Sequence, residues 1–314
     1  MTGTRVVGFG HFQPARVVTN AEMETIVETS DEWIQRRVGI KERRWASEDE
    51  TVEVMATKAA QDALAKANMN ASQIDMIILA SCTTFDHSPN VASRVALALE
   101  MTNDPVALDI NTACSGFTHG VALASQAIAA GSNETVMVIG VDKLTDVTDF
   151  TDRSTVVLTA DGAGAAILTA ADEQGVSPVV WGAIPQMGSA VRIERKNNDK
   201  FAQEGQAVYR WATSELPKIA KQIVEKAGLT PDDLAAIVLH QANLRIIEPL
   251  ARKIGAPNAI VATDVVYSGN TSAASVPLAL SKLLEEHPLP SGAPILMFAF
   301  GGGLSYAGQV IKAP

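Results

Sequence analysis

Three segments in the first half of the 314-residue chain each have a similar segment in the second half, and their order is the same. Residues 66–80, KANMNASQIDMIILA, align with residues 226–240, KAGLTPDDLAAIVLH, and each stretch ends a helix and enters a buried strand. Residues 112–124 and 268–280 then each open an apolar helix from a turn of small residues, and residues 160–168 and 300–311 are glycine-rich turns that lead into strands. Three matches in one order predict a duplicated α/β unit.

Short apolar runs indicate the strands of each unit: MIILA (76–80), VALDI (106–110), VMVIG (136–140) and AIVLH (236–240). Continuous apolar runs of this length are typical of strands that are covered on both faces. Because helices alternate with them, we expect a mainly parallel sheet in each half. The polar segment at 171–176, AADEQG, is the predicted join between a half at 1–172 and a half at 173–314.

Composition excludes several classes of protein. A net charge of −10 argues against a nucleic-acid-binding protein, because phosphate contacts need a basic face. Two cysteines allow neither a disulfide framework nor a cysteine-rich zinc site, and we expect no metal site. The first residues lack the layout of a signal peptide, and runs such as PILMFAF are too short to span a bilayer. We therefore expect a cytoplasmic protein that does not bind membranes.

Cys114 is the candidate nucleophile of the chain. It lies between the strand VALDI and a helix expected from about Ser115 to Gly131. The free backbone N–H groups and the positive dipole end at a helix start favour a thiolate, the form in which cysteine is nucleophilic. Cys82 follows a core strand without a glycine-rich helix start, and we expect it to be a buried, unreactive cysteine.

His240 and Asn270 are the candidate partners of Cys114. His240 ends the strand AIVL, and open α/β sheets bind ligands at strand ends. The repeat places Asn270, in YSGNTSAAS, at the position in the second half that corresponds to Cys114 in the first. A pseudo-twofold axis between the halves would bring all three side chains into one pocket. The remaining histidines are expected to be surface or packing residues: His11, His87, His119 and His287.

With these residues identified, the chain resembles the β-ketoacyl-acyl-carrier-protein synthase III family, the condensing enzymes that initiate bacterial type II fatty-acid synthesis. The segments that carry the resemblance are TSDEWIQRRVGIKER, DINTACSGF, DRSTVVLTADGAGAAIL, LHQANLRIIEPLA, SGNTSAASVPLAL and FGGGLSYAG. The resemblance runs nearly end to end. It implies a thiolase-like, five-layered α-β-α-β-α fold built from two duplicated halves, and a homodimer.

The resemblance also implies the chemistry of the candidate residues. Cys114 would take the acyl group from acyl-CoA, and His240 and Asn270 would bind the malonyl thioester of malonyl-acyl-carrier protein and stabilise the enolate formed on loss of carbon dioxide. This carbanion would attack the acyl-Cys114 thioester to give a 3-ketoacyl product. The backbone N–H groups of Cys114 and Gly302 match the oxyanion hole of the family. No cofactor is needed, because the coenzyme A thioester is itself a substrate.

Further residues match binding positions of the family. Trp33 and Arg153 match the residues that hold the adenine of coenzyme A, and Arg37 matches a CoA-contacting arginine. Arg245 resembles the docking residue for the acidic carrier protein. Arg252 and Lys253 either extend that patch or are ordinary solvated charges.

The loop CTTFDHSPN departs from many members of the family. It carries Ser88 where others have a bulky residue, and in this family the loop often lines the acyl tunnel of the partner subunit. We therefore expect Ser88 to belong to the acyl pocket and to leave room for branched or longer primers.

Several alternatives stay open or are excluded at this point. A thiolase would need a second active cysteine, and none follows Cys114. A hydroxymethylglutaryl-CoA-type synthase would need a carboxylate base, for which no motif is evident. A related acyltransferase or polyketide-priming condensing enzyme of secondary metabolism would keep most of these segments. An acyl-CoA-binding subunit without turnover and a cysteine hydrolase are further alternatives. The HQAN and GNTSAASVP segments favour carbon–carbon condensation, because both groups are needed for decarboxylation.

Overall fold

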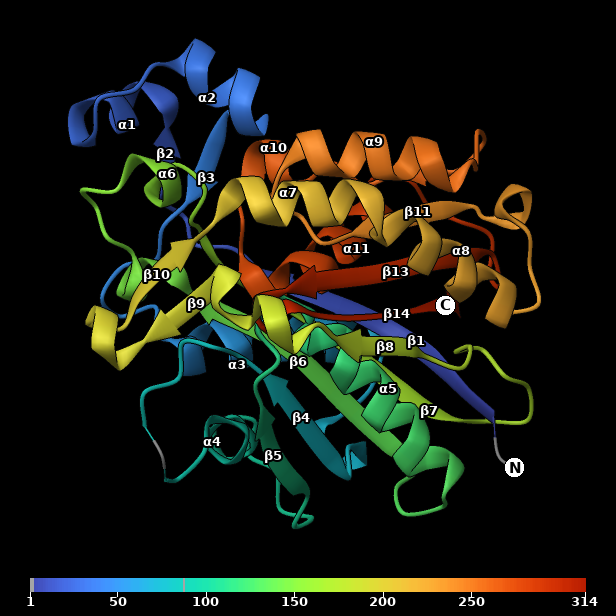
Figure 1. The fold of residues 1–314 in the computed structure, drawn as a ribbon. Helices are drawn as coiled ribbons and strands as arrows, with labels where there is room; N and C mark the ends of the chain where they lie inside the picture. The colour runs from blue at the N-terminus through green and yellow to red at the C-terminus, as the bar shows by residue number, and fades with distance from the viewer. Residues whose placement is uncertain (1–2, 87) are drawn as a thin grey trace.

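The computed structural model describes residues 3–86 and 88–314, and two five-stranded sheets form its centre (Figure 1). The first sheet has the order β1 (Gly3–Phe12), β7 (Asp161–Ala171), β6 (Thr135–Lys143), β4 (Met76–Ala80) and β5 (Val106–Ile110). The second has the order β8 (Val180–Ala183), β14 (Ser305–Lys312), β13 (Pro294–Gly301), β11 (Ala236–Leu239) and β12 (Ile260–Val261). One sheet therefore comes from residues 3–171 and the other from residues 180–312.

The two sheets match strand for strand. β4 pairs in parallel with β5 and β6, and β11 pairs in parallel with β12 and β13. The pairs β6–β7, β7–β1, β13–β14 and β14–β8 are antiparallel. This identity of order and direction confirms the duplication. The expectation of mainly parallel sheets is confirmed for strand direction, because only β7 and β14 run against the other four strands of their sheets.

Helices form three layers around the sheets (Figure 1). The outer face of the first sheet is covered by α3 (Val52–Ala67) and α4 (Val91–Ala98). The outer face of the second sheet is covered by α7 (Gly205–Ser214), α8 (Leu216–Lys226) and α9 (Leu244–Ile254). α5 (Gly116–Ala129) and α11 (Ser275–Glu286) contact strands of both sheets and lie between them. The order of layers is the predicted α-β-α-β-α.

One apolar core fixes the two middle helices. Phe117 of α5 and Leu280 of α11 share this core with Ile78 and Val138 of the first sheet and Met297 of the second, and all five are fully buried. Burial of one such side chain stabilises the fold by about 1.5–3 kcal/mol. The first turns of α5 and α11 are thereby held in place, and the candidate residues lie at these two turns.

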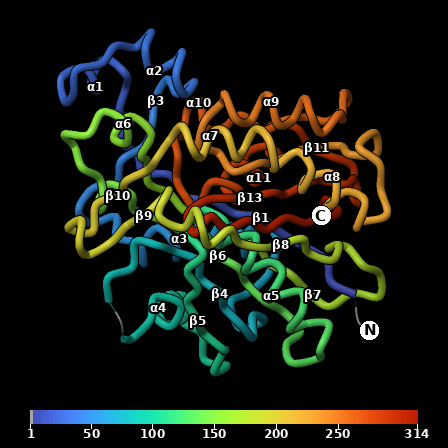
Figure 2. Tube along the Cα trace, viewed as in Figure 1, coloured from blue at the N-terminus to red at the C-terminus, as the bar shows by residue number. Residues whose placement is uncertain are grey.

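The N-terminal segment packs on the second half of the chain. It comprises β2 (Val17–Thr19), α1 (Asn20–Ile26), α2 (Asp31–Val38) and β3 (Glu42–Arg44), and Figure 2 draws it in blue beside α9 and α10 (Val265–Ser268). Ile34 of α2 shares a core with Ile247 of α9. α2 ends at Gly39, where φ is +81° and a Cβ would lie 2.5 Å from the Cβ of Leu244, so only glycine fits.

Smaller elements complete the described chain. β9 (Val191–Glu194) and β10 (Lys200–Gln203) form a separate hairpin, and α6 (Arg153–Val156) follows the loop after β6. Within the described residues, the helices are all too short or too polar to cross a membrane.

Candidate active site

Cys114 lies in a tight turn between β5 and α5, as the sequence predicts. The preceding residue, Ala113, has a φ of +48°, and the side chain of Asn111 holds this turn by accepting a hydrogen bond from the Ala113 N–H at 3.1 Å. Across the turn lies Gly301 at the end of β13. A Cβ at Gly301 would lie 2.6 Å from the Cys114 Cβ and 2.8 Å from its Sγ, so the nucleophile position depends on this glycine.

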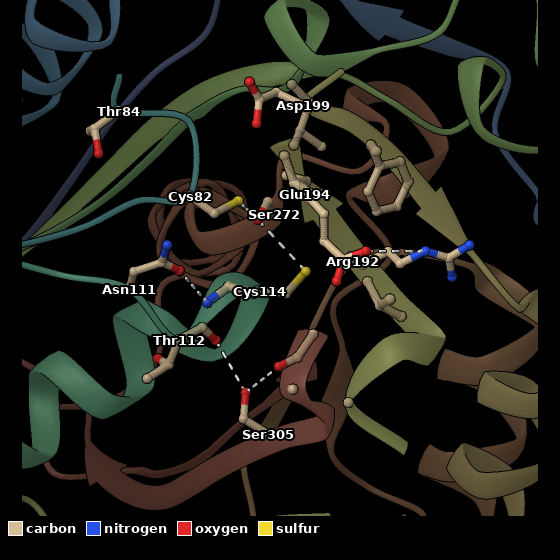
Figure 3. A pocket seen from close by; sticks show the side chains of 18 of the residues that line it. Cys82, Thr84, Asn111, Thr112, Cys114, Arg192, Glu194, Asp199, Ser272 and Ser305 are labelled. Atoms are coloured by element: carbon tan, nitrogen blue, oxygen red, sulfur yellow. Dashed lines mark hydrogen bonds and ion pairs between the residues drawn. The ribbon is translucent and has the colours of Figure 1, made fainter. Parts of the chain in front are cut away.

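A cavity of about 700 Å³ opens in front of Cys114 (Figure 3). Asn270 and Gly302, both predicted site residues, line it together with Cys114. Its apolar lining comes from Leu144, Val191, Ile193 and Phe201, and its volume is that of an ordinary small-molecule site. The structure therefore brings three of the predicted residues to one cavity.

His240, the third predicted catalytic residue, is not among the residues that line this cavity. It follows β11, is 4% exposed, and its Nδ1 lies 2.7 Å from the Oγ of Ser275, the first residue of α11. The Ser275 Oγ also accepts a hydrogen bond from the Gln241 N–H at 3.3 Å, so its own proton is free to be donated to Nδ1. In the tautomer in which Ser275 donates to Nδ1, the His240 ring carries its proton on Nε2.

Asn270 is the equivalent of Asn111, and this corrects the predicted alignment with Cys114. Each asparagine Oδ1 accepts a hydrogen bond from the N–H two residues on, at 3.1 Å for Asn111 and 2.9 Å for Asn270. The residues so held, Ala113 and Ser272, have φ values of +48° and +52°. Cys114 is therefore matched by Ala273. The sequence carries a signal for this register, because an Asn-Thr pair stands at 111–112 and again at 270–271.

Burial raises the pKa of the Cys114 thiol to about 11. A hydrogen bond from Ser272 lowers this pKa, the negative charge of Asp142 raises it, and the backbone N–H groups of Gly302 and Cys114 lower it. The backbone donors thus favour the thiolate, as predicted, but desolvation outweighs them. The two N–H groups that act on the sulfur are the pair predicted for the oxyanion hole.

Burial lowers the pKa of His240 to about 3, so the ring is neutral at pH 7. In the unfolded chain a histidine titrates near 6.5, and protonation there favours unfolding as the pH falls from about 6.5 towards 3, by ~1.4 kcal/mol per pH unit. His240→Leu removes this dependence. We expect the stability advantage of the wild type over His240→Leu, measured by urea unfolding, to shrink by that slope below pH 6.5.

Other titrating groups are common to both proteins and cancel in this comparison. Asp161 is one of them, because burial raises its pKa to about 6 and its effect on stability has the opposite sign in acid. A difference between the two proteins that stays constant from about pH 7 to 5 would contradict a neutral, buried His240.

The predicted CoA-contacting residues lie together at the surface. The guanidinium carbons of Arg153 and Arg37 lie 4.8 and 5.8 Å from the ring centroid of Trp33, which is half-buried. Arg153 also donates a hydrogen bond to the backbone carbonyl of Glu28 at 2.9 Å. Two cations over one indole form a platform on which a planar ring can stack.

The three predicted docking cations are exposed on α9. Arg245 lies over the ring of Tyr209 at 5.5 Å, near the end of α9 that contacts α2. Arg252 and Lys253 lie in the last turn, where the Lys253 ammonium donates to the backbone carbonyl of Thr213 at 2.7 Å. Arg245 is thus the cation beside the Trp33 platform.

Sequence reasoning missed several features of the cavity. Cys82, expected to be buried, lines it beside Ser272. The carboxylates of Glu194 and Asp199, on the β9–β10 hairpin, also line it, although no motif indicated an acidic group here. No local sequence signal marks these residues, because they reach the cavity only through long-range packing.

Among the described residues, the other histidines and Ser88 are not part of the cavity lining. Ser88 is exposed and is not among the lining residues described for this chain, so its role in a partner subunit's tunnel stays a prediction. His87 lies outside the described residues. His11 lies beside the Lys66 ammonium, which already bonds Asp62 and Glu285, and His119 stacks on Trp181.

Two family models match the chain. The model described as 3-oxoacyl-[acyl-carrier-protein] synthase III matches residues 108–185, and the model of the C-terminal part of that protein matches residues 224–313. The chain is 56% identical to β-ketoacyl-[acyl-carrier-protein] synthase III 4 of Streptomyces coelicolor, over 99% of both chains. It is 56% identical to synthase III 2 of Streptomyces avermitilis, over 100% of both chains.

Two solved structures extend these similarities to the fold. The priming β-ketosynthase from the R1128 polyketide biosynthetic pathway has a TM-score of 0.96 and 38% identity, covering 99% of this chain and 96% of the other. The 3-oxoacyl-[acyl-carrier-protein] synthase III from Aquifex aeolicus VF5 has a TM-score of 0.95 and 38% identity, covering 99% and 100%.

Proposed function

The chain belongs to the β-ketoacyl-[acyl-carrier-protein] synthase III family of acyl-transferring condensing enzymes, and we propose that it joins an acyl group from acyl-CoA to malonyl-acyl-carrier protein with loss of carbon dioxide. The observation that carries this proposal is one cavity lined by the thiol of Cys114, the carboxamide of Asn270 and the backbone of Gly302. A nucleophile and hydrogen-bond donors at one site are what acyl transfer requires.

Acylation is a thiol exchange at Cys114. The sulfur attacks the thioester carbonyl of acyl-CoA, a bond to Cys114 forms, and the bond to the coenzyme A sulfur breaks. The proton of Cys114 ends on the released coenzyme A thiol, so no net proton is gained or lost. The N–H groups of Cys114 and Gly302, which already act on the sulfur, are placed to stabilise the negative carbonyl oxygen, a contribution of about 3–4 kcal/mol for one donor.

Decarboxylation of the malonyl unit uses the second half of the chain. The Asn270 Oδ1 is occupied by the Ser272 N–H, which leaves its NH₂ group as the donor to the cavity. The Nε2–H of neutral His240 is the second donor. Both would bind the thioester carbonyl oxygen and hold the enolate charge when carbon dioxide leaves. The carbanion then attacks acyl-Cys114, the bond to Cys114 breaks, and the 3-ketoacyl-carrier protein is released. Cys114 leaves as a thiolate and takes up one proton from solvent, which restores the resting thiol.

The product of this reaction is the first unit of a fatty acid, which is the pathway we propose. The alternative is the priming of a polyketide, and the similarity to the R1128 priming β-ketosynthase favours it. The two differ in the acyl primer and in the carrier protein that accepts it. Carrier proteins of both pathways therefore belong in the test.

A second copy of the chain is the expected partner in a homodimer. β5 is an edge strand of the first sheet, and its Val106 is 47% exposed. Beside it on α4, Leu97 is 79% exposed. An exposed apolar edge strand is normally covered in the functional assembly. The loop with Ser88 leads into α4, so a partner on this edge would come close to that loop.

The direct test combines mass and product. The purified protein is mixed with straight and branched acyl-CoAs, and intact mass is measured before and after addition of malonyl-acyl-carrier protein. We expect a gain of one acyl group, then its loss with release of carbon dioxide and appearance of a 3-ketoacyl product. Acylation followed only by free acid would support the hydrolase alternative, and binding of acyl-CoA without acylation would support a non-catalytic subunit.

Loss of the Arg153 guanidinium is expected to weaken acyl-CoA binding. A cation over an indole contributes about 0.5–2 kcal/mol, so Arg153→Ala should raise KM for acyl-CoA roughly 3- to 30-fold with kcat nearly unchanged. Arg16→Ala is the matched control, because Arg16 is an exposed arginine whose guanidinium lies 5.2 Å from the ring of another tryptophan, the buried Trp45. Equal effects of the two substitutions would argue against a CoA site at Trp33.

A further inference from the structure

Ser272 lies between the only two cysteines of the chain (Figure 3). Its Oγ is 3.6 Å from the Sγ of Cys114 and 3.6 Å from the Sγ of Cys82, and all three residues line the cavity. Ser272 is 2% exposed. The hydroxyl is thus enclosed, and it contacts the atom that forms the acyl thioester.

Two buried side chains hold this arrangement. The N–H of Ser272 donates to the Asn270 Oδ1 at 2.9 Å, which maintains the positive φ of the turn. The carboxylate of Asp142, fully buried on β6, accepts from the Ala273 N–H at 3.0 Å through one oxygen and from the Cys82 N–H at 2.8 Å through the other. One carboxylate therefore places both Cys82 and the residue after Ser272.

The hydroxyl of Ser272 has one hydrogen, and this decides the direction of the hydrogen bonds. A thiolate at Cys114 can only accept, so Ser272 must donate to it, and the Ser272 Oγ can then accept from the S–H of Cys82. If both hydrogen bonds ran in the opposite direction, Ser272 would donate to Cys82, and the charged sulfur would be a thiolate at Cys82. Burial and the charge of Asp142 oppose that form, because they raise the pKa of Cys82 well above its ordinary value.

We propose that Ser272 is a further catalytic residue, whose hydroxyl donates a hydrogen bond to the Cys114 sulfur and stabilises the thiolate that attacks acyl-CoA. The protonated thiol of Cys82 donates in turn to Ser272 and fixes its orientation. Neither Ser272 nor Cys82 gives up its proton, and the proton of Cys114 still leaves with coenzyme A. The inference rests on the proposed function, because it concerns the thiolate that accepts the acyl group.

Ser272→Ala tests this proposal while leaving the backbone bond to Asn270 in place. We expect the rate of Cys114 alkylation by iodoacetamide at about pH 8, followed by peptide mass, to fall about ten-fold, and acylation by acyl-CoA at neutral pH to slow by about the same factor. This is the effect of losing one hydrogen bond to a charged group. Malonyl decarboxylation should change less than about three-fold, and Ser272→Thr should restore most of the acylation rate.

Ser268→Ala is the matched control. Ser268 is 1% exposed, and its hydroxyl bonds Gln13 and Lys282, away from the cavity lining. An unchanged alkylation rate of Cys114 in Ser272→Ala would overturn the proposal, and so would equal losses of acylation and decarboxylation that Ser272→Thr does not restore. Failure of the wild type to be acylated would instead remove the proposed function, so the two results are distinguishable.

Discussion

Cys114→Ala is expected to gain no acyl mass from any acyl-CoA and to lose at least about 10³-fold in condensation rate. The reason is that the substitution removes the sulfur atom that would carry the acyl group. This is the atom on which the backbone N–H groups of Gly302 and Cys114 act. The substitution leaves the Asn111 turn, the Gly301 contact and the second half of the site in place. Malonyl decarboxylation by Asn270 and His240 should therefore continue in the variant.

Folding of Cys114→Ala is checked by its urea midpoint. Alanine removes one partly buried sulfur atom, so we expect only a small loss of stability, on the order of 1 kcal/mol. Peptide mapping of the acylated wild type separates the two thiols that line the cavity. Acyl mass on Cys82, or acylation that persists in Cys114→Ala, would contradict the assignment of the nucleophile.

The sequence predicts the fold well wherever short-range patterns determine it. MIILA and VALDI coincide with β4 and β5, and AIVLH differs from β11 by one residue. Strand direction was predicted for four strands of each sheet, but the reversal of β7 and β14 was not, since burial on both faces gives the same apolar composition in parallel and antiparallel strands. The predicted register of the repeat at Asn270 was wrong, although the Asn-Thr pair at 111–112 and again at 270–271 marks the correct one in the sequence.

The residues of the candidate site also fall into those that the sequence predicted and those that only the structure shows. Cys114, Asn270, Gly302 and the Trp33 platform were predictable because family motifs mark them in the sequence. Ser272 lies inside such a motif, yet its contact with Cys114 spans 158 positions and appears only in the structure. The sequence also did not show that burial would raise the pKa of Cys114 more than the helix start lowers it. The helix start is a local feature, whereas the desolvation that outweighs it depends on the packing of the whole cavity.

Asn270→Asp is expected to slow malonyl decarboxylation and to retain acylation of Cys114, which is the reverse of the result expected for Cys114→Ala. Aspartate keeps the Oδ1 acceptor that holds the Ser272 N–H, so the turn persists, but it replaces the NH₂ donor by a negative oxygen. Loss of one preorganised donor to an enolate costs about 10²- to 10³-fold in rate. We expect malonyl decarboxylation to fall by that amount, with acylation of Cys114 slowed less than about ten-fold.

His240→Ala provides an independent comparison from another element of the second half. It removes the Nε2–H donor and leaves Asn270 untouched, so it should show the same pattern of slow decarboxylation with retained acylation. Carbon dioxide release and intact mass, measured on one sample of each variant, resolve the two steps. If both variants instead lost acylation and kept decarboxylation, the donors of the second half would serve the acyl-CoA step, and the division of labour between the duplicated halves would be the reverse of the one proposed.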